Sequence, residues 1–218
     1  MMPTLLDFFS NAGGAAMGYH RAGFRVIGID IEPHPRYPFE FFQGDAFELF
    51  EHLAPLADAI HGSPECRDHT PLTSRAGKTG TGWQLERFIE LCEQSGKPYV
   101  VENVMAARFP AAYPSNLTLC ADRHFGLRTV RHRKFRCSGF TVPQPPHPVG
   151  HSAPTSTKKR RYDWDLGMHT SVTGDVTQEI ASVAMGIDWM NSKELSQAIP
   201  PAYTEYIGGH LFRELRSA

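Results

Sequence analysis

The sequence predicts an α/β fold, with a parallel, doubly wound sheet and a small, mostly irregular appendage. Two observations favour this fold. In the first half of the chain, apolar segments of strand length alternate with segments of helical periodicity, as in βαβ units. Glycine-containing turns or acidic residues follow the strand-like segments, and ligands bind at the carboxyl ends of strands in such sheets.

The expected elements follow one another along the chain. Residues 4–9 and 24–31 are predicted strands, joined by a glycine turn and a short helix. Further strands are expected at 57–61 and 99–101, with an amphipathic helix over 84–93 between them. The apolar face of that helix carries Leu85, Phe88, Ile89 and Cys92. Cys92 is therefore expected to pack in the core.

Composition limits the class of protein. The 218 residues suffice for one substantial core, with an irregular connection rich in proline, histidine, serine and threonine over 143–157. Four cysteines without a CxxC pair, and no apparent signal peptide, predict reduced thiols and a cytoplasmic location. No apolar run reaches membrane-spanning length. The net charge of -1 conceals an uneven distribution of charge, because the basic residues are concentrated late in the chain.

Three segments predict an adenosine pocket. The turn over 7–14 brings backbone close to a ligand, Asp30 can accept both hydroxyls of a ribose, and Asp45 offers a second carboxylate after the next strand. Each signal has a structural alternative. The glycine pair can serve only as a turn, and either carboxylate can cap the following helix. The combination favours ligand binding.

A thiol and a carboxylate are expected to face the same crevice. Cys66 follows the turn at 61–65, and Glu102 follows the strand predicted at 99–101. Such a pair suits covalent catalysis with acid assistance. A buried cysteine and a surface acid are the structural alternatives, but Cys66 has polar neighbours, which argues against burial.

Several segments, in the same order, resemble motifs of the DNA cytosine-5 methyltransferases. Asp7 to Gly14 resembles Asp-Leu-Phe-x-Gly-x-Gly-Gly, 62–66 resembles Gly-x-Pro-Pro-Cys, and 102–104 matches Glu-Asn-Val. The remaining similarities lie at 28–32, 44–46, 125–133 and 196–208. The chain departs from the family at Phe8 and Asn11 in the first motif, at Glu65 beside the cysteine, and at Thr129, where glutamine is usual.

The resemblance implies a Rossmann-like methyltransferase fold with S-adenosylmethionine as cofactor. A core over 1–135, a reduced target-recognition region over 136–195 and a C-terminal segment over 196–218 that returns to the core are expected. The residues expected to bind the cofactor are Phe8, Phe9, Asn11, Gly13, Gly14, Asp30, Ile31, Asp45, Ala46, Pro64, Trp83, Ala198 and Ile199.

The implied chemistry is methyl transfer to C5 of cytosine. Cys66 would add to C6 as a thiolate, and Glu102 would hold or donate a proton at ring N3. Because a free thiol has a pKa of about 8.5, Arg131 or Arg133 could supply the positive charge that favours the thiolate. The two arginines could instead lie on a solvated strand face. Cys120, His124, His132 and Cys137 match no common zinc spacing, and no metal is expected.

The expected partner is DNA with a short recognition site. Seven basic residues are expected to contact nucleic acid, namely Arg128, Lys134, Arg136, Lys158, Lys159, Arg160 and Arg161. A solvated loop is the alternative for the last four. Only about 60 residues remain for target recognition, which leaves three alternatives open. A separate partner could supply specificity. The substrate could be RNA or a free deoxycytidine nucleotide, or the protein could be an inactive regulator that binds the cofactor. Compact forms of this family are familiar from phages and mobile elements, and the purpose of the methyl mark is open.

Overall fold

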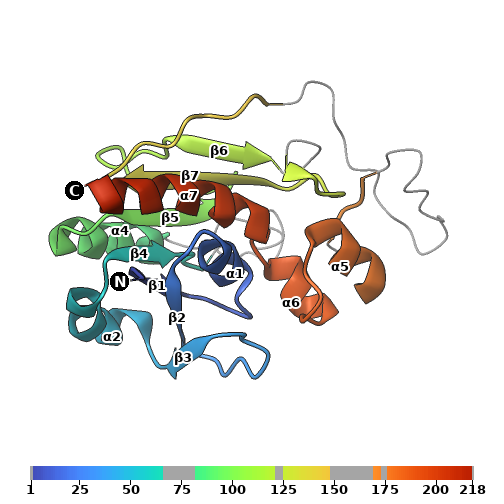
Figure 1. Ribbon diagram of the computed structural model, residues 1–218, viewed down its shortest axis with the longest axis horizontal. Helices are drawn as coiled ribbons and strands as arrows, with labels where there is room; N and C mark the ends of the chain where they lie inside the picture. The colour runs from blue at the N-terminus through green and yellow to red at the C-terminus, as the bar shows by residue number, and fades with distance from the viewer. Residues whose placement is uncertain (1, 66–81, 121–124, 148–168, 173–175, 218) are drawn as a thin grey trace.

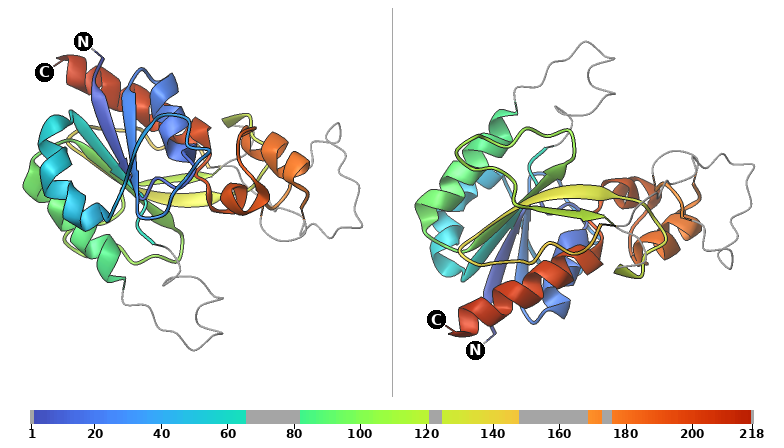
Figure 2. Two further views of the ribbon diagram at one scale, coloured as in Figure 1. Left: turned by 90° about the horizontal axis from the view of Figure 1, so that it is seen from below. Right: turned by 90° about the horizontal axis from the view of Figure 1, so that it is seen from above.

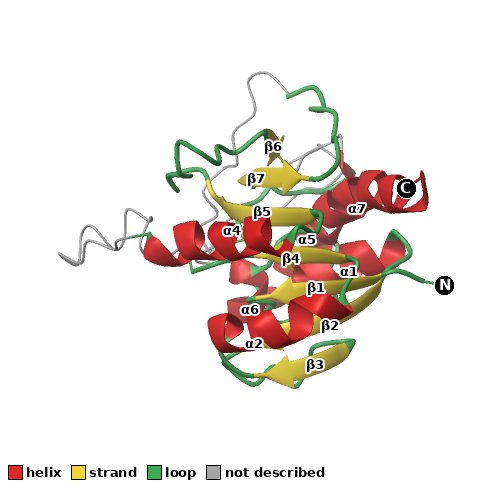
Figure 3. Ribbon diagram, turned by 90° about the vertical axis from the view of Figure 1, so that its left-hand side faces the viewer, coloured by secondary structure: helices red, strands yellow, loops and turns green. Residues whose placement is uncertain are grey.

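A mixed sheet of seven strands forms the centre of the molecule (Figure 1). The computed structural model describes residues 2–65, 82–120, 125–147, 169–172 and 176–217. The strands are β1 (Thr4–Phe8), β2 (Arg25–Asp30), β3 (Glu40–Gln43), β4 (Ala59–Gly62), β5 (Tyr99–Val104), β6 (Leu117–Cys120) and β7 (His132–Ser138). Their order in the sheet is β3-β2-β1-β4-β5-β7-β6, which Figure 3 shows from edge to edge.

The helices lie on both faces of the sheet. They are α1 (Gly14–Arg21), α2 (Ala46–Leu53), α4 (Trp83–Ser95), α5 (Gln178–Met185), α6 (Ser192–Gln197) and α7 (Pro201–Ser217), with a 3-10 turn at Ala54–Leu56. Figure 2 shows α1 and α7 on one face and α2 and α4 on the other, with α5 and α6 beyond one end of the sheet. Among the described residues, no helix combines the length and apolar character needed to cross a membrane.

The buried side chains explain the two layers. Leu5, Val100 and Phe135 point to the face that α1 and α7 cover, whereas Leu6 and Val101 point to the face that α2 and α4 cover. Because both faces are covered, the central strands are apolar almost throughout, as expected of a parallel sheet. On α4, the four apolar residues expected on one face are all buried, and Cys92 packs in the core.

The sheet differs from the expected one at one edge. Strands β3, β2, β1, β4 and β5 are parallel, but β7 runs antiparallel to both β5 and β6. Pairing with β7 extends β5 to Val104, so Glu102 lies within a strand instead of after it. The parallel sheet expected from the first half of the chain therefore extends from β3 to β5, and at the other edge the antiparallel strands β7 and β6 replace a further βα unit.

Candidate functional site

The turn between β1 and α1 has an unusual backbone. Phe9 and Asn11 adopt φ angles of 56° and 47°, and Gly13 one of 84°. Left-handed backbone is uncommon outside glycine and typically collects at functional sites, where surrounding contacts hold it. Here the Ser10 amide donates to the Ile29 carbonyl at the end of β2 (3.1 Å), which fixes the turn against the neighbouring strand.

Asp30 lies at the carboxyl end of β2 and joins two turns. Its Oδ2 accepts a hydrogen bond from the Asn11 amide (2.9 Å), and its Oδ1 accepts one from the Glu32 amide (3.1 Å). It therefore orients the glycine turn as well as ending the strand. The side chain of the next residue, Ile31, is 61% exposed.

The carboxyl of Glu102 is buried on β5, opposite the basic side chains that precede and begin β7. It is 6% exposed, and its Oε1 lies 2.7 Å from Arg133 Nε. Burial raises the pKa of Glu102 above its usual value, although Arg133, Arg131 and the Ser63 hydroxyl each oppose this shift. The arrangement keeps a proton on this carboxyl to a higher pH than on an exposed glutamate.

The loop that leads to Cys66 is tied to the same strand. Asn103 on β5 donates from Nδ2 to the Pro64 carbonyl (3.2 Å), and the Ser63 hydroxyl contacts Glu102. The chain from 63 to 65 therefore runs directly beside the Glu102 carboxyl. Cys66 itself lies outside the described residues.

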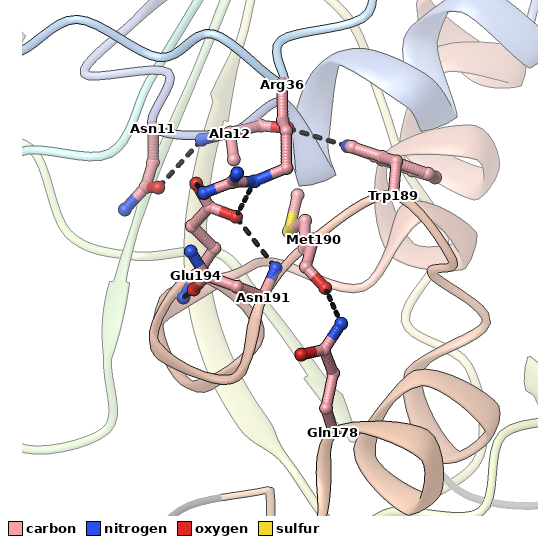
Figure 4. Close-up of polar contacts among 8 residues, drawn as sticks. All are labelled: Asn11, Ala12, Arg36, Gln178, Trp189, Met190, Asn191 and Glu194. Carbon is pink, nitrogen blue, oxygen red and sulfur yellow. Dashed lines mark hydrogen bonds and ion pairs between the residues drawn. The ribbon is translucent and has the colours of Figure 1, made fainter.

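Residues 189–197, late in the chain, pack against the glycine turn and Arg36 (Figure 4). Trp189 Nε1 donates to the Ala12 carbonyl (2.8 Å), and Arg36 forms two hydrogen bonds of 2.9 Å with the Glu194 carboxylate, which also belongs to the capping box of α6. A further bond of 2.8 Å joins Asn11 Nδ2 to Gln197 Oε1. Residues 189–197 thus form one wall of the turn.

The structure resembles several methyltransferases over almost its whole length. A prophage-encoded protein of E. coli, assigned as a DNA modification methyltransferase, superposes with a TM-score of 0.67 at 15% identity over 98% of this chain and 99% of that one. The methyltransferase EhMeth of Entamoeba histolytica gives 0.63 at 12% identity over 99% of each chain. The Dnmt2 methyltransferase of S. pombe gives 0.59 at 11% identity over 97% and 98%.

The chain has the Rossmann-like fold of these methyltransferases.

Sequence comparison gives a narrower match. The type II methyltransferase M1.HphI of Haemophilus parahaemolyticus is 29% identical over 128 residues, which cover 48% of this chain and 33% of that protein. The chain therefore spans about a third of the length of the curated relative that it matches. No family model matches the sequence. The Rossmann-like methyltransferase fold expected from the motifs is confirmed.

Within this methyltransferase fold, several residues expected to bind cofactor are buried, among them Phe8, Ala46, Ala198 and Ile199. Phe8 is fully buried, with its ring 5.2 Å from that of Phe50 and 5.5 Å from that of Phe88. Ala46, Ala198 and Ile199 also lie in the core clusters. Because β1 directs the Phe8 side chain into the α2 and α4 face, the predicted contact of Phe8 with the cofactor would be made by its backbone.

Other expected cofactor residues lie at the rim of the site. Trp83 is 52% exposed at the start of α4 and stacks on Phe47 at 5.2 Å, while the Phe9 ring meets Phe47 at 5.7 Å. Asp45 caps α2, since its Oδ1 accepts from the Phe47 and Glu48 amides (2.8 and 3.2 Å). Asp45 therefore caps the following helix through Oδ1, as the structural alternative predicted.

Glycine is required where α1 meets the C-terminal segment. A Cβ on Gly14 would lie 2.5 Å from the Ile199 carbonyl oxygen, and one on Gly13, at its positive φ, would lie 2.8 Å from Pro38 Cδ. The Ala198–Ile199 pair thus lies against the first turn of α1. This contact explains why residues so far apart in sequence border the same turn.

Arg131 and Arg133, the two arginines predicted to be catalytic, have different partners in the structure. Arg133 pairs with Glu102, whereas Arg131 donates from its guanidinium to the Ser196 carbonyl (2.8 Å) and is 7% exposed. The Tyr203 hydroxyl donates to the Arg131 carbonyl. Arg131 therefore links the Glu102 site to the C-terminal segment, and neither arginine lies on a solvated face.

Arg136, one of the residues expected to contact nucleic acid, is bound by other groups of the protein. Arg136 donates to Tyr99 Oη (2.7 Å) and pairs with Glu93 (2.9 Å). These contacts lie on the face of β5 and β7 opposite to Glu102. Lys134 lies on the same strand face as Arg136 and approaches the Ala107 carbonyl (3.4 Å). The Arg128 backbone joins α5 and Thr170, and Lys158, Lys159, Arg160 and Arg161 lie outside the described residues.

Sequence reasoning missed a buried polar cluster beneath the turn. His61 Nδ1 lies 2.9 Å from Tyr19 Oη, its Nε2 lies 3.1 Å from Ser63 Oγ, and Asp7 Oδ1 lies 3.9 Å away. Burial lowers the pKa of His61 to about 3 and raises that of Asp7. The available signal was the acid of the first motif and the histidine immediately before Gly62, both within strand-like apolar segments.

Proposed function

We propose that this protein transfers a methyl group from S-adenosylmethionine to C5 of cytosine in DNA through a covalent adduct of Cys66 at C6. The observation that carries the proposal is the Glu102 carboxyl. It is buried on β5, has a raised pKa, is held 2.7 Å from Arg133 and lies beside the loop that leads to Cys66. This is the environment that a proton donor to a ring nitrogen requires.

The proposed reaction uses the chain's residues in sequence. The Cys66 thiolate adds to C6, and Glu102 gives or shares its proton at N3, so that electron density moves to C5. C5 then takes the methyl group as the carbon–sulfur bond of the sulfonium breaks. Loss of the C5 proton to a base and elimination of the Cys66 sulfur regenerate the free enzyme. S-adenosylmethionine supplies the methyl group in this scheme.

The cofactor site fits the strand ends beside the glycine turn. Asp30 offers a carboxylate for ribose hydroxyls, and the exposed Ile31 side chain offers an apolar surface for adenine. Phe9 and Trp83, which both pack on Phe47, border this region. Asn11, Gly13 and Gly14 supply the close backbone approach.

Two of the similar proteins support DNA as the substrate. M1.HphI is a type II methyltransferase, and the E. coli prophage protein is assigned to DNA modification. The same chemistry on RNA or on a deoxycytidine nucleotide would use the same residues. A duplex substrate would require the target base to leave the stack.

The test is transfer of labelled methyl from S-adenosylmethionine to duplex DNA, single-stranded DNA, RNA and deoxycytidine nucleotide in parallel. We expect 5-methylcytosine in DNA, its loss in Cys66→Ala, and an unchanged cofactor dissociation constant in that variant. Cys92→Ala is the control, because Cys92 is buried in α4. Label found only in RNA or in the nucleotide would show that DNA is not the substrate. Cofactor binding without transfer would indicate a regulator, and turnover by Cys66→Ala would rule out the covalent scheme.

A further inference from the structure

Strand pairing brings a thiol and two imidazoles together at the sheet edge. Cys120 ends β6 and lies directly opposite His132, the first residue of β7. Opposed residues of an antiparallel pair project to the same face with their Cβ atoms about 5 Å apart. His147 approaches the same point, and the ligand atoms of all three side chains lie within 4.8 Å of one another.

The position of His147 is fixed by contacts along the outer edge of β6. Gln144 accepts from the Thr118 amide (2.9 Å) and donates to the Thr118 carbonyl (2.7 Å), so its side chain pairs with the strand edge. Tyr206 on α7 donates to the Pro143 carbonyl (2.8 Å). Two anchors thus precede His147, and Figure 1 shows this segment running back past β6.

The two imidazoles face each other through the nitrogens that commonly bind metals. His132 Nε2 lies 2.9 Å from His147 Nε2, the ring centroids are 5.1 Å apart, and the ring planes are inclined by 24°. Ring nitrogens this close share either a proton or a metal ion. With Zn–N bonds of about 2.0–2.1 Å, two nitrogens of a tetrahedral site lie about 3.3 Å apart, so a movement of a few tenths of an ångström would admit the ion.

We propose that Cys120, His132 and His147 form a zinc site, with water in the fourth position. One thiolate and two imidazoles suit Zn²⁺, whereas Mg²⁺ and Ca²⁺ prefer oxygen ligands. The Zn–S bond forms as the thiol proton leaves to solvent. Cys120 is buried, His132 is half-buried and His147 is exposed, which gives the ion a path from solvent. Cys137 lies on the opposite face of β7, in the core beneath α7.

Strand pairing explains why sequence spacing did not predict this site. Only 11 residues separate Cys120 from His132, and 14 residues separate His132 from His147, an arrangement unlike the CxxC and HxxxH patterns of common zinc sites. The bound ion would join β6, β7 and the segment at 143–147. It would act as a structural cross-link, independently of the methyl-transfer proposal.

The experiment uses the full chain, stripped of metal with a chelator and titrated with Co²⁺ and then Zn²⁺. We expect one Co²⁺ per chain, with a thiolate-to-cobalt absorption band that Zn²⁺ abolishes. Cys120→Ser should remove the band, and His147→Ala should weaken zinc binding at least about 100-fold. Because His147 is exposed, the second variant should fold normally.

Matched controls are Cys92→Ala and His52→Ala, which change a cysteine and a histidine outside the cluster. Both should bind Co²⁺ as the original chain does. Zinc should also raise the melting temperature of the original chain more than that of Cys120→Ser. Absence of the band, or a band that persists in Cys120→Ser, would overturn the proposal.

Discussion

The carboxyl of Glu102 is governed by two opposing influences. Burial favours its neutral form, while the charges of Arg133 and Arg131 favour the carboxylate, and burial is the larger effect. Since the pKa in the folded protein is raised, protonated Glu102 favours the folded state at low pH. That contribution declines as the pH rises through the folded-state pKa. Proton donation to a cytosine ring should decline over the same interval.

Glu102→Gln should therefore lower kcat for methyl transfer by about 100-fold or more, because an amide cannot deliver the proton. The original enzyme should also lose kcat as the pH rises through the raised pKa of Glu102, and the residual activity of the variant should lack this dependence. Single-turnover kinetics across the pH range would measure both effects.

Glu93→Gln is the matched control for this substitution. Its carboxylate also pairs with an arginine of β7, but on the opposite face, where Arg136 and Tyr99 are its partners. It should leave kcat and its pH dependence unchanged. Full kcat in Glu102→Gln would contradict a proton-donor role for this carboxyl.

Helices α1 and α7 cross at a glycine. A Cβ on Gly18 would collide with the Pro201 carbonyl and with Thr204 Oγ1, which lie on the first turn of α7. Thr204 also donates to the Ala15 carbonyl (2.8 Å), so the helices are joined by a hydrogen bond at the same crossing. Close approach at this point allows α7 to cover the sheet with Tyr203, Ile207 and Leu211.

Gly18→Ala should lower the free energy of unfolding by about 2 kcal/mol or more, because the added methyl group has no space without backbone movement. Gly209→Ala, also within a helix, should raise it by about 0.5–1 kcal/mol, since its Cβ would meet nothing closer than Arg213 at 3.9 Å. Urea unfolding of both variants provides the comparison. A neutral Gly18→Ala would show that the crossing adjusts at little cost.

Elements with a clear local period could be predicted from the sequence, and those defined by distant partners could not. The apolar runs and the amphipathic spacing gave β1, β2 and α4 nearly within their observed bounds. Glu102 and Asn103 looked like the end of a strand because they are polar, yet β7 pairs with them. The pairing direction of β7 depends on the fold around it, which a local pattern does not record.

The same limit applies to the site. Motif resemblance located Asp30, Glu102 and the glycine turn, but not the partners of their side chains. The sequence did not distinguish Arg136 from the basic residues beside it, whereas in the structure Arg136 forms an ion pair with Glu93. Phe8 shares a motif with Phe9, but alternation along β1 sends it into the core.

At the scale of the whole molecule, the candidate cofactor site joins segments from both ends of the chain. The glycine turn at 9–14 is bonded to Trp189 and Gln197, and Gly14 lies against Ile199. A ligand held by the turn should therefore stabilise the C-terminal segment together with it. Two regions separated by about 180 residues are therefore expected to unfold and to be stabilised together.

S-adenosylmethionine at about 100 times its dissociation constant should raise the free energy of unfolding by about 2.7 kcal/mol. Amide hydrogen exchange should slow in residues 9–14 and 189–199 together, because each segment holds the other. The hairpin-like pair of β6 and β7, which lies at the far edge of the sheet, provides the internal reference. Added protection confined to 9–14 would show that the two segments respond separately.

The packing of α7 onto the sheet also has a consequence for the protein's synthesis. Translation produces all the described strands before α7, so the part of the α1 and α7 face that α7 covers stays exposed on the nascent chain until Pro201–Ser217 leaves the ribosome. Exposed apolar faces of this kind are where chaperones bind and where incomplete chains aggregate. The glycine turn is made before residues 189–197, which form its second wall.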